Sequence, residues 1–272
     1  MTQRTVFIVS GGTGITAEAI SNSMLSQFGD IHFEQRTLIY IRSDEDCHDI
    51  VRQIREAAER NHSKPVVFST LVNPRHREML SKSGALVLDL FGTFLEPLEG
   101  ELGIRSSEKV GHSHAVRDPS AYRLRIDAVH FALENDDGAH TRHYDQADIV
   151  LIGVSRSGKT PTSLYLALQL GLYPANYPFT EEDFDDLRLP EALEPHKDKL
   201  FALLIDPERL TAIRQERMAG SRYASAQQCE AEVRAFNAIV ARYGIPSINV
   251  TERSIEEIST KILAATGLKR RV

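Results

Sequence analysis

The sequence has few residues that could form covalent or metal cross-links. Its two cysteines, Cys47 and Cys229, lie far apart and form no C-x-x-C pair. Disulfide frameworks and structural zinc sites need more cysteines at closer spacing. The sequence therefore predicts neither, and a hydrophobic core has to stabilise the fold. The hydrophobic content of 42% over 272 residues is enough for such a core.

A surplus of positive charge is also missing. The formal net charge is −6 and the isoelectric point about 5.9, whereas general nucleic-acid binders usually carry a basic surplus. The first apolar run, Val6–Val9, is too short for a signal-peptide core or a membrane span. We therefore expect a cytoplasmic protein without a nucleic-acid or membrane partner. The basic stretch Lys269–Arg271 is expected to be solvated.

Short apolar runs alternate with amphipathic segments, which predicts an α/β fold with a mainly parallel sheet. We expect an N-terminal α/β unit over residues 1–105, a connector and helix over 106–146, and a second α/β domain over 147–272 with a helical C-terminal end. A helix starting near Thr16 is expected to turn Ile20, Met24 and Phe28 inward. Strands are expected at 6–9, 66–72, 85–90, 149–152 and 200–205, and a later helix is expected to bury Val233, Phe236 and Val240.

The segment Gly153–Thr160 reads GVSRSGKT, a complete match to the P-loop pattern G-x-x-x-x-G-K-[ST]. With Gly near 7% of residues, a chance match in a chain of this length has a probability on the order of 1%. A predicted buried strand precedes the segment and a predicted helix follows it. Backbone N–H groups and the positive helix end can then surround an anion. The sequence predicts a phosphate-binding loop in a P-loop kinase-like domain; the alternative is a glycine-rich turn with an exposed lysine.

The pattern assigns roles within this loop. Lys159 is expected to act catalytically on the terminal phosphates, and the Thr160 hydroxyl is expected to bind Mg²⁺. The residues expected to contact the phosphates are Gly153, Val154, Ser155, Arg156, Ser157, Gly158, Lys159 and Thr160.

Phosphoryl transfer also needs a carboxylate, for the metal or for the attacking hydroxyl. Asp206 is the first candidate because it ends a predicted strand, where a Walker B acid would lie. The alternative for Asp206 is a helix N-cap before Pro207. Asp136 and Asp137 are second candidates, with Asp137 taken as the catalytic one. Their alternative is an ordinary Asp-Gly turn.

Three further features remain open. Arg156 could contact a phosphate oxygen or face solvent. The arginines Arg209, Arg214 and Arg217 of the next predicted helix could form a solvated face or a phosphate clamp. The glycine cluster Ser10–Gly14 lacks the dinucleotide-binding spacing, so it is either a tight turn or a loop that binds an anion or a partner.

The segment Gly153–Ala167 resembles the P-loop of the phosphoenolpyruvate synthase regulatory proteins. The resemblance covers nearly the whole chain and is far more specific than a P-loop alone. The other segments that carry it are Gly12–Glu18, Arg125–His130 leading to Asp136–Gly138, Ala175–Phe179, Ile205–Leu210 and Ser221–Ser225.

The resemblance implies a bifunctional enzyme. Such an enzyme uses ADP to phosphorylate a threonine of phosphoenolpyruvate synthase, and uses inorganic phosphate to remove that group with release of pyrophosphate. A sister branch acts on pyruvate, phosphate dikinase and usually has another residue in place of Gly158. One departure is Gly11, where the family commonly has aspartate. This leaves a catalytic role for the N-terminal loop in doubt.

We therefore expect the loop, Lys159 and Thr160 with Mg²⁺ to hold the phosphates of ADP, while Asp206, or else Asp137, accepts the threonine proton. The alternatives are the same chemistry on pyruvate, phosphate dikinase, a small-molecule kinase or NTPase with the same loop, and a nucleotide-sensing protein that binds its partner without chemistry. The sequence leaves a homo-oligomer open.

Overall fold

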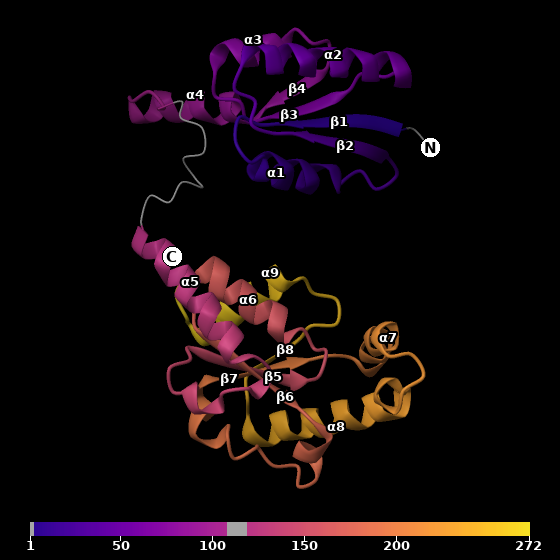
Figure 1. The fold of residues 1–272 in the computed structure, drawn as a ribbon, viewed down its shortest axis with the longest axis vertical. Helices are drawn as coiled ribbons and strands as arrows, with labels where there is room; N and C mark the ends of the chain where they lie inside the picture. The colour runs from indigo at the N-terminus through magenta and orange to yellow at the C-terminus, as the bar shows by residue number, and fades with distance from the viewer. Residues whose placement is uncertain (1–2, 108–118) are drawn as a thin grey trace. The chain divides into compact units, whose positions relative to one another are not determined.

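The computed structural model describes residues 3–107 and 119–272 and divides into two compact units, Met1–Ala115 and Val116–Val272 (Figure 1). Each unit has a parallel sheet and helices, which confirms the predicted α/β class. Residues 108–118 of the expected connector lie outside the described residues. Within the described ranges, no helix is long and apolar enough to cross a membrane.

The first unit is a four-stranded parallel sheet in the order β2-β1-β3-β4. Helices α2 and α3 cover one face and α1 covers the other (Figure 1). The strands are β1 (Gln3–Val9), β2 (His32–Leu38), β3 (Val66–Ser69) and β4 (Leu86–Asp89), and the helices are α1 (Ile15–Leu25), α2 (Asp44–Asn61), α3 (Pro74–Ser81) and α4 (Leu90–Leu102).

Helix α1 buries only part of the face expected, because Ile20 is half-buried and packs against the core while Met24 does not. Its buried residues are Ala17, Ser21 and Leu25, whereas Met24 is 45% exposed and Phe28 is 56% exposed. The helix ends at Leu25, so Phe28 lies beyond it. Small side chains let a helix approach a sheet closely, and packing of this kind overrides a pattern read from large apolar residues alone.

The second unit is also a four-stranded parallel sheet, in the order β6-β5-β7-β8. Every residue of the central strand β5 is buried. Helix α8 lies on one side of the sheet, and α5, α6 and α9 lie on the other (Figure 1). The strands are β5 (Ile149–Val154), β6 (Pro174–Phe179), β7 (Leu200–Leu204) and β8 (Ser247–Asn249), and the helices are α5 (Pro119–Glu134), α6 (Lys159–Leu170), α7 (Pro207–Arg217), α8 (Ala226–Tyr243) and α9 (Ile255–Thr266).

Packing around this sheet agrees with the pattern for α8, whose residues Val233, Phe236 and Val240 are buried as expected. Helix α5, which the sequence placed in a connector, packs along α6 in this unit. Its Phe131 ring stacks on Tyr173, with 5.1 Å between the ring centroids.

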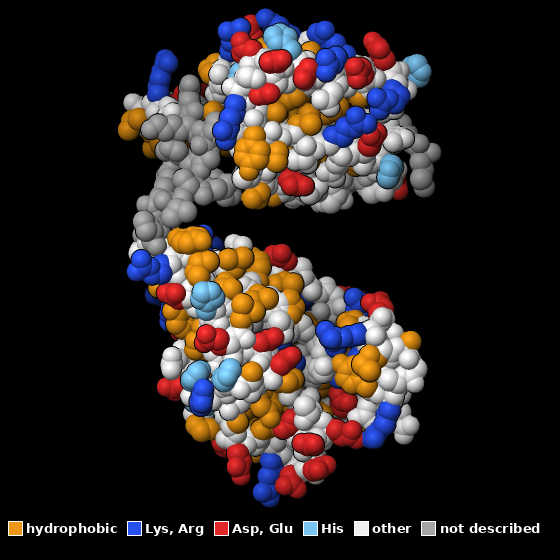
Figure 2. Space-filling model, viewed as in Figure 1, with side chains coloured by type: hydrophobic (Ala, Val, Ile, Leu, Met, Phe, Trp, Pro, Cys, Tyr) orange, Lys and Arg blue, Asp and Glu red, His pale blue; other side chains and the backbone are white. Residues whose placement is uncertain are grey.

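The basic stretch near the end of the chain is docked rather than fully solvated. Arg271 forms an ion pair with Asp148 at 2.5 Å, and its backbone N–H donates to the Leu170 carbonyl at 2.9 Å. Its guanidinium lies 5.2 Å from the centroid of the Tyr173 ring. The expectation of a solvated tail is therefore wrong for Arg271. Elsewhere, side chains of both charge signs are mixed over the face drawn in Figure 2.

Candidate active site around the Gly153–Thr160 loop

The Gly153–Thr160 loop joins the end of β5 to the start of α6, as the sequence predicts. Two of its residues have left-handed backbone, Arg156 with φ 77° and Gly158 with φ 83°. A non-glycine residue in this region costs on the order of 1–3 kcal/mol, and such strain concentrates at functional sites. A β-carbon at Gly153 would lie 2.9 Å from the Leu203 carbonyl oxygen and would collide with the Ser157 side chain. This close approach requires glycine at position 153.

Lys159 lies inside the curve of the loop and is 4% exposed. Its amine donates to the carbonyl oxygens of Gly153 at 3.1 Å and Val154 at 3.0 Å. Burial lowers the pKa of Lys159 to about 8, although the charges of Asp137 and Asp136 act to raise it. The amine is thus a buried cation close to the loop backbone, with two acidic residues near enough to influence its charge.

Asp136 is the carboxylate that contacts the loop directly. Its Oδ1 accepts hydrogen bonds from the Thr160 hydroxyl at 2.8 Å and from the Asn176 amide at 2.5 Å. Asn176 is fully buried on β6, so it fixes the position of Asp136 from the neighbouring strand. The Asp-Gly turn that the sequence offered as an alternative therefore brings an acid to the threonine of the loop.

Asp137 follows in the same 3₁₀ turn, η1 (Asp136–Gly138), with left-handed φ of 48°. Its backbone N–H donates to the Asn176 side-chain oxygen at 3.0 Å, while its side chain is exposed. One buried asparagine thus orients both aspartates. The carboxylate of Asp137 stays accessible to a reactant, and its charge acts on Lys159.

Asp206 lies at the N-cap position of α7, but its side chain makes no capping hydrogen bond. Its Oδ1 instead accepts from the Asn249 amide at 2.8 Å, and its backbone N–H donates to the Thr251 hydroxyl at 2.9 Å. These contacts direct Asp206 toward the end of β8. The structure thus joins Asp136, and not Asp206, to the loop threonine.

The oxygen atoms of Asp136 and Thr160 suit Mg²⁺, which usually takes one or two protein oxygens together with phosphates and water. Among residues 3–107 and 119–272, no group of three or more His, Cys, Asp or Glu could hold a metal ion. The two oxygens of Asp136 and Thr160 leave the other Mg²⁺ positions to phosphate and water, so this donor set fits a metal that arrives with a phosphate ligand.

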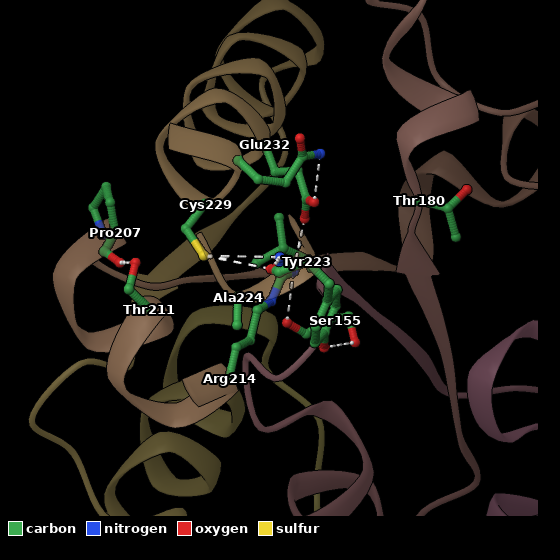
Figure 3. A network of polar contacts seen from close by, with 12 residues as sticks. Ser155, Thr180, Pro207, Thr211, Arg214, Tyr223, Ala224, Cys229 and Glu232 are labelled. Atoms are coloured by element: carbon green, nitrogen blue, oxygen red, sulfur yellow. Dashed lines mark hydrogen bonds and ion pairs between the residues drawn. The ribbon is translucent and has the colours of Figure 1, made fainter. Parts of the chain in front are cut away.

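A buried arginine, Arg214 of α7, supports the loop through a network of polar contacts (Figure 3). The Arg214 side chain is wholly buried, and its Nη2 donates to the Ser155 carbonyl at 3.1 Å and to the Glu232 carboxylate at 2.6 Å. Its Nη1 donates to the Tyr223 carbonyl at 3.0 Å. Burial lowers the pKa of Arg214, but the hydrogen bond and the charge of Glu232 raise it above its usual value. This buried ion pair therefore holds the loop backbone in place through the bond to the Ser155 carbonyl.

Tyr223 completes this support from the short turn η5 (Arg222–Ala224). Its ring lies 4.1 Å from the Arg214 guanidinium, and its hydroxyl is 2.9 Å from the Ser155 hydroxyl. Arg214 is not part of a solvated face, because its side chain is buried and its guanidinium bonds to Glu232 and to backbone carbonyls. No local pattern points to these roles of Glu232 and Asn176, since both depend on contacts between distant segments.

Comparison with known proteins shows the family to which the chain is similar. The model of the family described as kinase/pyrophosphorylase matches residues 6–263. A protein of Alcanivorax borkumensis is 64% identical over 270 residues, which cover 99% of each chain. One from Marinobacter nauticus is 54% identical over 268 residues (98% and 99%), and one from Acinetobacter baylyi is 56% identical over 270 residues (99% and 97%). All three are provisionally named phosphoenolpyruvate synthase regulatory proteins.

Proposed function

Because the chain belongs to the kinase/pyrophosphorylase family, we propose that it regulates phosphoenolpyruvate synthase by reversible phosphorylation. It transfers a phosphoryl group from ADP to a threonine of that enzyme and removes the group with inorganic phosphate. The observation that carries the proposal is the Gly153–Thr160 loop with Lys159 inside it and Asp136 on its threonine. The names of the relatives support the choice of partner. The reaction takes place in the cytoplasm.

In the forward reaction, the loop backbone and Lys159 hold the phosphates of ADP. Asp137 takes the proton of the target threonine as its oxygen bonds to the β-phosphorus. The bond between that phosphorus and the bridging α–β oxygen breaks, and AMP leaves with the electron pair. Asp136 and Thr160 would hold Mg²⁺, which neutralises charge on the phosphates when bound.

In the dephosphorylation reaction, inorganic phosphate binds in the same loop. One of its oxygens bonds to the phosphorus of the phosphothreonine, and the bond to the threonine oxygen breaks. Pyrophosphate is released, and Asp137 in its protonated form returns the proton to the threonine oxygen. Both reactions need one anion-binding loop, and the sequence contains one complete P-loop pattern.

The proposal is tested with purified phosphoenolpyruvate synthase, β-labelled ADP and γ-labelled ATP in parallel. Label should appear on a synthase threonine with ADP alone, and adding inorganic phosphate should release it as labelled pyrophosphate. Pyruvate, phosphate dikinase is the matched alternative substrate. Label on the dikinase alone, or on neither protein while ADP binds, would contradict the proposed partner.

The support of the loop by Tyr223 gives a milder prediction. Tyr223→Phe removes the hydroxyl that contacts Ser155 and keeps the ring beside Arg214. A hydrogen bond contributes about 0.5–1.5 kcal/mol net, so we expect ADP affinity to fall roughly two- to tenfold. Calorimetric titration measures the effect. Tyr243→Phe is the control, because the Tyr243 hydroxyl makes no hydrogen bond with the described residues. Equal affinity of Tyr223→Phe and the wild type would contradict this role.

A further inference from the structure

The first unit has a cavity of its own, at the carboxyl ends of its strands. Its volume is about 500 Å³, within the range of roughly 300–1,000 Å³ that is typical of small-molecule sites. The residues that line it are Gly11, Ile41, Arg42, Leu71, Val72, Asn73, Pro74 and His76. All of them belong to the first unit, whereas the Gly153–Thr160 loop belongs to the second.

The strand order places this cavity where α/β sheets bind ligands. From β1, the chain passes through α1 to β2 on one side and then crosses to β3 on the other side. Such a reversal opens a crevice beyond the carboxyl ends of the two diverging strands, here β1 and β3. The lining residues follow β1, β2 and β3 in sequence, so the cavity coincides with this crevice.

The loop Ser10–Gly14 crosses the same edge. The Ser10 hydroxyl accepts hydrogen bonds from the Gly12 N–H at 3.2 Å and from the Thr70 hydroxyl at 3.0 Å, which joins the loops after β1 and β3. Gly14 has a left-handed φ of 82° and is the N-cap of α1. The first residues of α3, at Asn73 and Pro74, line the cavity directly. Helix N-termini favour a bound anion.

Two of the three acidic residues in the first turn of α2, Asp44 and Asp46, are already engaged. The Asp44 carboxylate contacts the Arg75 guanidinium at 2.6 Å and the His76 ring at 3.2 Å. The Asp46 carboxylate accepts the backbone N–H groups of Arg42 and Ser43, both at 2.9 Å, and these bonds lower the pKa of Asp46. These contacts keep both carboxylates occupied by groups of the protein itself.

Arg42 is the cation of the lining that stays free to bind a ligand. Its guanidinium lies 5.6 Å from the centroid of the Tyr40 ring and forms no ion pair with the described residues. A guanidinium binds phosphate oxygens in a bidentate manner. Arg42 thus supplies a positive charge for an anionic ligand, while Ile41 and Leu71 add apolar surface to the cavity.

We propose that this cavity binds a small phosphorylated molecule. The phosphate lies against Arg42 and the Ser10–Gly14 loop, and the organic part lies against Ile41 and Leu71. The site is additional to the proposed ADP site and does not depend on it. Of the two alternatives open for the Ser10–Gly14 loop, this proposal adopts anion binding.

Hydrogen–deuterium exchange of the full chain tests the site, with inorganic phosphate and AMP as separate probes. Peptides covering 10–16 and 70–76 should be protected in the wild type and equally in Lys159→Met, which weakens the other site. Arg42→Ala should raise the probe concentration for half-protection about tenfold, in line with the loss of one charge-assisted contact. Gly11→Leu should abolish protection, because the new side chain fills the cavity. The backbone tolerates the substitution, since Gly11 has no positive φ.

Arg52→Ala is the matched control, because it removes one positive charge from an exposed position of α2. It should leave the protection unchanged. Stronger protection by AMP than by phosphate is expected if the organic part contacts Ile41 and Leu71, and equal protection contradicts that contact. Protection confined to peptides around residues 153–160, or protection of 10–16 that persists in both Arg42→Ala and Gly11→Leu, overturns the proposal. ADP protection at 153–160 is read separately, so failure here leaves the proposed function intact.

Discussion

Replacing Lys159 with methionine should reduce kcat/KM for both the ADP-dependent and the phosphate-dependent reaction by about a thousandfold, the scale of losing one charge-stabilising group. The amine lies inside the loop, and no other lysine lies within the Gly153–Thr160 loop. Methionine keeps most of the buried alkyl chain and removes only the charge. Equal loss in both directions is expected because both reactions bring phosphate oxygens to the same amine.

Stability should respond far less than activity. Burial lowers the pKa of Lys159 to about 8, which means that the folded protein disfavours its charged form relative to an exposed lysine. Removing the charge therefore takes away an unfavourable burial, and the thermal midpoint should change by no more than about 4 °C. A large fall in the midpoint would attribute the lost activity to misfolding.

Lys199→Met is the matched control for this experiment. The Lys199 amine also donates to two backbone carbonyls, those of Tyr144 and Asp145, at 3.4 and 2.6 Å, but it lies outside the loop. We expect the activity of Lys199→Met to stay within about threefold of the wild type, as for an ordinary contact near the protein surface. Similar losses in Lys159→Met and Lys199→Met would show that Lys159 has no special role.

Local patterns predicted the parts of this protein that depend on neighbours in sequence. The strand, loop and helix around Gly153–Thr160 were expected from glycine spacing and apolar runs, and β5 and α6 confirm them. Helix α8 was likewise expected, with Val233, Phe236 and Val240 inside. Strands β2, β6 and β8 were not predicted as strands, because their composition lacks a clear apolar run.

The remainder depends on contacts between distant segments. The order β6-β5-β7-β8 places Asn176 of β6 beside the loop, and no spacing in the sequence shows which strand will lie there. Asp206 had the better local signal, at the end of an apolar run. Asp136 had the weaker signal, yet it is the acid that contacts Thr160. The role of Arg214 was not predicted for the same reason, because its partner Glu232 is eighteen positions away on another helix.

Three matched substitutions separate the acids. Asp136→Asn should lower kcat at least about a hundredfold, because an amide binds Mg²⁺ and orders the Thr160 hydroxyl less well than a carboxylate. It should also raise the Mg²⁺ concentration needed for half-maximal rate. Asp137→Asn should lower kcat by roughly 10²–10⁴, the usual contribution of a general base, with its Mg²⁺ requirement unchanged. Steady-state rates at several Mg²⁺ concentrations distinguish the two patterns.

Asp206→Asn is the third substitution and the decisive comparison. Its carboxylate bonds to Asn249 rather than to the loop, and an exposed residue with such a contact should change kcat by no more than about threefold when it becomes an amide. The Walker B hypothesis from the sequence expects the reverse, with Asp206→Asn nearly inactive and Asp136→Asn active. Loss of activity and of the Mg²⁺ response in Asp206→Asn, together with an active Asp136→Asn, would reject the assignment of the metal to Asp136.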